Sequence, residues 1–149
     1  MDQIDVLFEA VAKQKLAHGP TLGCLYTGDA FPPHCAPMPR SPIPNVGMLF
    51  DESFPEMLKA AIGLNPAIHD GAVMIGRTSS AEAYRIRGWS FRLFPPDIAI
   101  SGEPNRGAAY NSCLAMSAIA GVDKLYLVSG NVVRCFFAGN ARQLAQPDG

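Results

Sequence analysis

Residues 65–75 read NPAIHDGAVMI, and this stretch decides the fold. Its asparagine and proline turn the chain. A short apolar run follows Gly71 from Ala72 to Ile75, and such a run bounded by turn residues is typical of a buried strand. The stretch therefore predicts a turn that brings Asp70 and Gly71 to the mouth of a strand.

Helix and strand signals also lie upstream. An apolar stripe at helical spacing runs from the N-terminus to about residue 18 and predicts an amphipathic helix. Residues 21–27, TLGCLYT, are short and mostly apolar, as expected of a buried strand. Ser53 and Glu56 form a capping box that opens a second helix, and we expect Gly63 to end it.

Downstream, residues 81–87 alternate as a strand does, and a helix rich in small residues is expected from Asn105 to Gly121. Two strands, 125–128 and 132–137, follow it and are joined by a Gly-Asn hairpin turn. The order of elements predicts one layered α/β domain over residues 1–149, with helices covering a central mixed β-sheet.

A proline-rich segment interrupts this pattern at residues 31–44, which read FPPHCAPMPRSPIP. Prolines this frequent remove too many backbone donors for a helix or a central strand. We expect a long loop inserted within the domain, and loops of this length in compact domains are often functional.

The charge balance limits the partners. The chain has 149 residues, with 12 Lys+Arg against 13 Asp+Glu and only 17% charged residues. A near-neutral chain lacks the basic surface needed for sequence-independent binding to nucleic acids or to membrane surfaces. We therefore expect no nucleic acid partner and no membrane partner, and any bound anion must be held locally.

The cysteines and the N-terminus indicate the compartment. Cys24, Cys35, Cys113 and Cys135 form no C-x-x-C pair, so they are interpreted as small buried hydrophobes in a reducing compartment. The N-terminus carries two acids where a secretory signal needs a basic start, and no apolar run approaches the ~20 residues that span a bilayer. We expect a cytoplasmic protein.

Asp70 and Gly71 are the first candidate site. A carboxylate at the mouth of a strand can ligate a divalent metal or accept a proton from a hydroxyl, and the glycine lets a flat ligand approach the backbone. The alternative is a turn in which the two residues only reverse the chain. On these residues alone the alternative is favoured.

The start of the small-residue helix is the second candidate. Residues 102–109 read GEPNRGAA, and a helix N-terminus presents free N–H groups that bind phosphate. Arg106 would add a charged donor there. The alternative is that Asn105 is a simple N-cap and Arg106 a solvated residue of the first turn.

Other side chains favour structural interpretations. His34, Cys35 and His69 lack the spacing of a metal site. Trp89 is interpreted as packing in a β-region, and Asp123 as a turn residue.

Taken in order, these segments resemble the diadenylate cyclase domain, a family that makes cyclic di-AMP from two ATP molecules. The resemblance covers residues 22–144. Residues 23–26 correspond to an early Gly-Ala-Leu-Ile strand of the family, and residues 65–75 correspond to its turn and its His-Asp-Gly-Ala-Val-Ile-Ile strand. Residues 93–95 correspond to its Leu-Pro-Leu segment, and residues 106–117 to its Arg-His-Arg-Ala-Ala helix. Residues 123–144 correspond to its closing strands.

The sequence departs from this family where the family holds phosphates. The family motif Gly-Thr-Arg-His-Arg-Ala-Ala stands opposite EPNRGAA at residues 103–109, so one arginine, Arg106, remains in place of the histidine. An acidic Ser-Glu-Glu segment stands opposite SGN at 129–131. Losing one such charged donor costs a few kcal/mol, or on the order of a hundredfold in rate. The resemblance therefore implies a catalytically inactive sensor that binds a nucleotide or a cyclic dinucleotide.

The resemblance also implies roles for particular residues. The nucleoside site would be lined by Asp70, Gly71 and Ala72, and a phosphate would be contacted by Asn105, Arg106 and Gly107. Active cyclases pair two sites face to face, which favours a homodimer, and a sensor requires an effector protein. No cofactor is required, although Mg²⁺ or Mn²⁺ would be held by Asp70 if the nucleotide binds through it.

Two alternatives stay open. The first is an active diadenylate cyclase in which Asp70 is metal ligand and base, with Arg85, Arg87 or Arg92 recruited to hold the phosphates. The second is a protein-interaction module whose working surface is the proline-rich segment and whose ancestral pocket is vestigial.

Overall fold

The computed structural model describes residues 2–14, 19–96 and 107–144. Its helices are α1 (Gln3–Lys13), α2 (Phe54–Leu64) and α3 (Ala108–Met116), with a 3-10 helix η1 (Pro66–His69). Its strands are β1 (Thr21–Thr27), β2 (Cys35–Pro37), β3 (Ala72–Arg77), β4 (Arg85–Leu93), β5 (Val122–Ser129), β6 (Val132–Phe137) and β7 (Asn140–Gln143). None of the helices in these ranges combines the length and the apolar character that crossing a membrane requires.

The strands form one mixed sheet of seven strands in the order β2-β4-β3-β1-β5-β6-β7. The central strand β1 runs parallel to β3, with Leu22 opposite Ala72, and antiparallel to β5, with Thr21 opposite Val128. The beginnings of β1 and β3 and the end of β5 therefore lie at the same edge of the sheet. The predicted α/β domain with a mixed sheet is confirmed.

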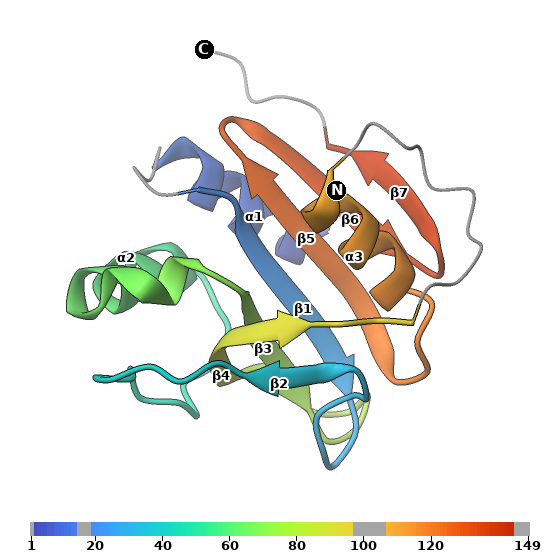
Figure 1. Ribbon diagram of the computed structural model, residues 1–149, viewed down its shortest axis with the longest axis horizontal. Helices are drawn as coiled ribbons and strands as arrows, with labels where there is room; N and C mark the ends of the chain where they lie inside the picture. Colours follow the sequence, from blue (N-terminus) through green and yellow to red (C-terminus); the bar gives the residue numbers. More distant parts are fainter. Residues whose placement is uncertain (1, 15–18, 97–106, 145–149) are drawn as a thin grey trace.

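Helices cover both faces of the sheet, α1 and α2 on one side and α3 on the other (Figure 1). Side chains alternate along β1: Leu25 belongs to the core beneath α1 and α2, and Cys24 to the core beneath α3. Phe8 of α1 stacks on Tyr126 of β5 with ring centroids 4.3 Å apart. Two apolar layers thus hold the sheet between its helices.

Several local expectations hold. The strand at residues 21–27 has the expected bounds, and the Gly-Asn turn joins β5 to β6. The amphipathic first helix is α1, where Asp2 caps the N-terminus by accepting a bond from the Asp5 N–H at 2.8 Å.

The start and end of α2 differ from prediction. Ser53 makes no side-chain cap, because its hydroxyl donates to the nearer carboxylate of Asp51. Gly63 does not end the helix either, since α2 continues to Leu64 and Asn65 follows as its C-cap. A proline in the first turn, Pro55, is pre-organised for the helix and supports its start.

Other boundaries move as well. The strand expected at 81–87 is β4, which begins only at Arg85 and extends through Trp89 to Leu93. Within its described residues, the helix expected from 105 to 121 covers Ala108–Met116. The proline-rich segment contributes the short edge strand β2, where a proline is tolerated, and β7 was not expected as a separate strand.

Candidate functional site

The Asp70–Gly71 turn lies at the sheet edge where β1 and β3 begin. Residues from β4 reach the same edge, because Ala72 pairs with Phe91. The proline-rich segment does so too, because Pro37 of β2 also pairs with Phe91 and the chain continues past Met38. Four parts of the sequence therefore meet at this edge.

The turn is built by η1 and by a glycine. Asn65 caps η1 through its side-chain oxygen, which accepts from the Ala67 N–H at 3.2 Å, and the Asp70 N–H donates to the Ala67 carbonyl at 3.1 Å. Gly71 has φ +94°, and a Cβ there would lie 2.6 Å from Met38 Cε and 2.8 Å from the carbonyl oxygen of Phe91. Only glycine fits this backbone against β4.

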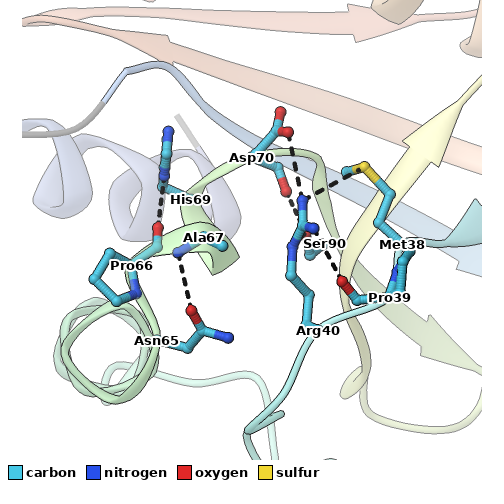
Figure 2. Close-up of polar contacts among 9 residues, drawn as sticks. All are labelled: Met38, Pro39, Arg40, Asn65, Pro66, Ala67, His69, Asp70 and Ser90. Carbon is cyan, nitrogen blue, oxygen red and sulfur yellow. Dashed lines mark hydrogen bonds and ion pairs between the residues drawn. The ribbon is translucent and has the colours of Figure 1, made fainter.

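Arg40 closes the turn from the proline-rich segment (Figure 2). Its Nε donates to Ser90 Oγ at 3.0 Å, and its Nη2 lies 3.4 Å from Asp70 Oδ2. The Ser90 hydroxyl in turn donates to the Asp70 carbonyl, and Ser90 is buried with φ +59°. A residue other than glycine in the left-handed region is a strained conformation that the surrounding bonds must support.

His69 lies next to this network, and it forms no metal site with the described residues around it. Its Nδ1 lies 2.6 Å from the carbonyl oxygen of Pro66, within the turn (Figure 2). Throughout the ranges that the structure describes, no three His, Cys, Asp or Glu side chains gather to hold a metal ion. The polar partner of Asp70 at this site is the Arg40 guanidinium.

A cavity of about 390 Å³ lies at the start of α3 on the same edge. Its lining includes Pro20 before β1, Gly107, Ser129 at the end of β5, and Arg134 of β6. Gly107 is the N-cap of α3 with φ +87°, so the free N–H groups of the first turn follow it. Arg134 brings a positive charge to the cavity.

The described residues of the two predicted half-sites therefore share one edge. Asp70, Gly71 and Ala72 lie at the start of β3, and Gly107 lies beside the end of β5, with β1 between these strands. Strand spacing separates β3 from β5 by about 10 Å. Asn105 and Arg106 lie outside the described residues.

Asp123 was interpreted as a turn residue, and that was wrong. It lies in β5 at the opposite edge of the sheet, where its Oδ2 accepts from Thr27 Oγ1 and from the Tyr84 hydroxyl, both at 2.6 Å. Arg77 donates to Thr27 Oγ1 at 2.9 Å, and its guanidinium lies 4.4 Å from the centre of the Tyr84 ring. Burial, and then the bond to Asp123, raises the pKa of Tyr84.

The arginines considered for a rearranged phosphate grip do not share one place. Arg85 begins β4 at the edge opposite to Asp70, because it pairs with Gly76 near the end of β3, and its Nη1 donates to the Gly47 carbonyl at 2.9 Å. Arg85 therefore cannot assist Asp70. Arg92, next to Phe91, is at the correct end of β4 and is exposed.

Cys24 and Cys113 are buried in the apolar core and are poorly suited to act as nucleophiles. Burial raises the thiol pKa of both Cys24 and Cys113, so each is protonated at neutral pH. Both side chains belong to the core beneath α3, as the sequence indicated.

Sequence reasoning missed Arg40 as a residue of the site. One signal was present: Arg40 is the only Lys, Arg, Asp or Glu within residues 31–44. A single charge in an apolar, proline-rich loop is a candidate for a fixed partner. The sequence around Arg40 does not predict that Asp70 and Ser90 are its partners.

Comparison with known proteins gives similarity of fold. No family model matches the sequence, and no curated protein matches it. A double mutant of DacA from Staphylococcus aureus superposes with a TM-score of 0.62 at 15% identity, covering 97% of this chain and 85% of that one. A hypothetical membrane spanning protein from Bacillus cereus gives a TM-score of 0.65 at 14% identity, covering 96% of this chain.

This chain spans 62% of the length of the Bacillus cereus structure. At these identities the similarity concerns the fold alone. The fold is like that of DacA, in agreement with the fold expected from the sequence resemblance.

Proposed function

We propose that this chain is a nucleotide-binding sensor domain that keeps the fold of a diadenylate cyclase without its reaction. One observation carries the proposal: the Asp70–Gly71 turn and the start of α3 lie at the same edge of the sheet, on either side of β1. A nucleoside and its phosphate are joined groups, so a site that binds both needs two such features close together.

The turn suits the base and the ribose. Gly71 has no side chain, so a flat ring can approach the backbone of the turn. Asp70 is exposed, with 68% of its side chain accessible, and its carboxylate can accept a hydrogen bond from a sugar hydroxyl.

The cavity at the start of α3 suits the phosphate. The first N–H groups of a helix and its partial positive charge favour anions. Arg134 lies in the cavity lining as a charged donor. A near-neutral protein can bind an anion in this way, because the positive potential is local.

Compared with the family motif, the sequence lacks groups that would support the cyclase reaction. Residues 103–109 hold one arginine where the family motif has two arginines and a histidine. The β5–β6 turn carries Ser129, Gly130 and Asn131 in place of an acidic segment, so no carboxylate is supplied from it. Each missing donor removes transition-state stabilisation of the triphosphate. We therefore expect binding without turnover.

A binding domain of this kind acts through partners. We propose a cytoplasmic protein whose ligand is an adenine nucleotide or cyclic di-AMP and whose signal passes to an effector protein. A homodimer would bring two such edges face to face, as in active cyclases. Neither nucleic acids nor membranes are expected as partners of this near-neutral surface.

The test measures binding and turnover separately. Calorimetric titration of the protein with ATP, cyclic di-AMP and GTP should give saturable binding of at least one adenine ligand. Incubation with ATP and Mg²⁺ or Mn²⁺, followed by mass spectrometry, should show no cyclic di-AMP. Absence of binding at millimolar ligand would refute the sensor, and cyclic di-AMP formation that is lost in Asp70→Asn would establish the cyclase instead.

A further inference from the structure

The chain itself supplies a cation to Asp70. The Arg40 side chain is only 16% exposed, and it is held by a bond from Nε to Ser90 Oγ at 3.0 Å and from Nη1 to the Pro39 carbonyl at 3.0 Å. Its Nη2 faces Asp70 Oδ2 at 3.4 Å. The guanidinium is thus fixed by Ser90 and by its own loop, and the exposed carboxylate lies next to it (Figure 2).

A divalent metal ion is disfavoured at Asp70 by the neighbouring guanidinium. Magnesium demands near-octahedral oxygen ligands and is usually held by one or two carboxylates together with phosphates. The Asp70 carboxylate already faces a guanidinium, with Arg40 Nη2 3.4 Å from Oδ2. A metal ion placed there would also be repelled by Arg40.

We propose that Arg40 takes the place of a divalent metal ion at Asp70, so that an adenine nucleotide whose phosphate lies at the start of α3 binds this edge without metal. The inference rests on the nucleotide-binding function proposed above. A bare carboxylate repels an anionic ligand, and the repulsion is reduced when a cation lies beside the carboxylate. A guanidinium presents a planar set of donors that pair with carboxylate oxygens.

The proline-rich segment thereby becomes part of the site. Met38 packs against Gly71, and Arg40 reaches Asp70 and Ser90, so the loop contributes both apolar contact and charge. Arg40 is a specificity-determining residue, because its positive charge lets the site bind the ligand as an anion without a bound metal ion.

The experiment compares ligand affinity with and without metal. ATP and cyclic di-AMP are titrated into the wild-type protein by calorimetry, once in buffer with EDTA and once in buffer with Mg²⁺. We expect the dissociation constant of the tighter ligand to agree within about threefold between the two buffers, because Arg40 supplies the cation beside Asp70 in both. A tenfold difference would correspond to about 1.4 kcal/mol of binding free energy.

Three variants separate the charge of Arg40 from its geometry. Arg40→Gln should weaken binding in EDTA by tenfold or more and recover part of the loss in Mg²⁺. Arg40→Lys keeps the charge without the forked donors, so its affinity in EDTA should lie between that of Arg40→Gln and that of the wild type. Arg85→Gln is the matched control, because Arg85 also bonds a loop carbonyl but lies at the opposite edge, and it should bind as the wild type does.

The outcomes are distinct. Wild-type binding that is lost in EDTA and restored by Mg²⁺ would overturn the role of Arg40 and leave the proposed function standing. If Arg40→Gln binds in EDTA with wild-type affinity, the role of Arg40 is likewise overturned and the proposed function stands. Such binding would also show that the variant is folded. No binding of either ligand in either buffer would overturn both proposals.

Discussion

Tyr84 donates its hydroxyl hydrogen to the carboxylate of Asp123 at 2.6 Å, and this bond joins the residue before β4 to the beginning of β5. The same carboxylate oxygen accepts from Thr27 of β1 and lies 3.9 Å from Arg77 of β3. Four segments are therefore tied together at the edge opposite to the candidate site.

Asp123→Ala should destabilise the fold by about 2 kcal/mol, because two hydrogen bonds are lost and Arg77 loses the carboxylate that lies 3.9 Å from it. Urea unfolding followed by the fluorescence of Trp89, the only tryptophan, measures the change. Asp29→Ala at an exposed position of the same edge is the control and should cost less than about 0.5 kcal/mol. Equal stability of Asp123→Ala and wild type would show that the cluster contributes nothing.

Gly71→Ala should destabilise the protein by about 3 kcal/mol, because the residue has positive φ and its new Cβ would meet both Met38 and the backbone of β4. Gly130 also has positive φ, but a Cβ there has no heavy atom within 4 Å. Gly130→Ala should therefore cost only about 1 kcal/mol. Denaturant unfolding of both variants checks the ranking, and the reverse order would mean that the close approach at Gly71 is not required.

Asp5 and Arg142 should show strong energetic coupling. The Asp5 side chain is 2% exposed, its Oδ2 lies 3.0 Å from Arg142 Nη2, and it also accepts a bond from the Tyr126 hydroxyl. Arg142→Gln should cost about 2–3 kcal/mol, because it leaves a buried carboxylate without its cation. In the Asp5→Asn background the same substitution should cost under about 0.5 kcal/mol. Additive costs in the double-mutant cycle would contradict this pairing.

The N-cap of α1 should make stability depend on acid pH. Burial raises the pKa of Asp2, but bonds from the Lys124 ammonium and from the Asp5 N–H outweigh it, so the pKa is lowered from 3.8. A lowered pKa in the folded state gives stability that is present above the unfolded value and lost as pH falls through the folded value. The advantage of wild type over Asp2→Asn in free energy of unfolding should shrink as pH falls below about 4. A constant difference between pH 7 and pH 2 would contradict it.

The sequence predicts the central elements well because their signals are local. Residues 21–27 and the Gly-Asn hairpin are defined by neighbouring turn residues and apolar runs. The structure has β1 and β6 at the expected bounds, whereas β5 (Val122–Ser129) extends beyond the expected 125–128 at both ends. The N-cap of α2 shows the limit of such signals. Ser53 has the expected spacing to Glu56, yet its hydroxyl bonds to Asp51, a competitor two residues away.

The site is predicted only in part for the same reason. The Asp70–Gly71 turn can be read from its own residues, whereas Arg40 reaches Asp70 across 30 positions and Ser90 across 50. Asp123 was misjudged because its partners, Thr27 and Tyr84, come from β1 and from the residue before β4. Contacts of this kind depend on the order of the strands in the sheet, and a local sequence pattern does not predict that order.

The central claim is that an adenine nucleotide binds at the edge formed by the Asp70–Gly71 turn and the start of α3. Hydrogen–deuterium exchange with and without saturating ATP or cyclic di-AMP locates the ligand directly. The account predicts slower exchange in peptides covering residues 70–72, 89–91 and 107–110, and unchanged exchange in peptides around Asp123 at the opposite edge. Ligand-dependent protection confined to the opposite edge, or no protection in any peptide at millimolar ligand, would contradict it.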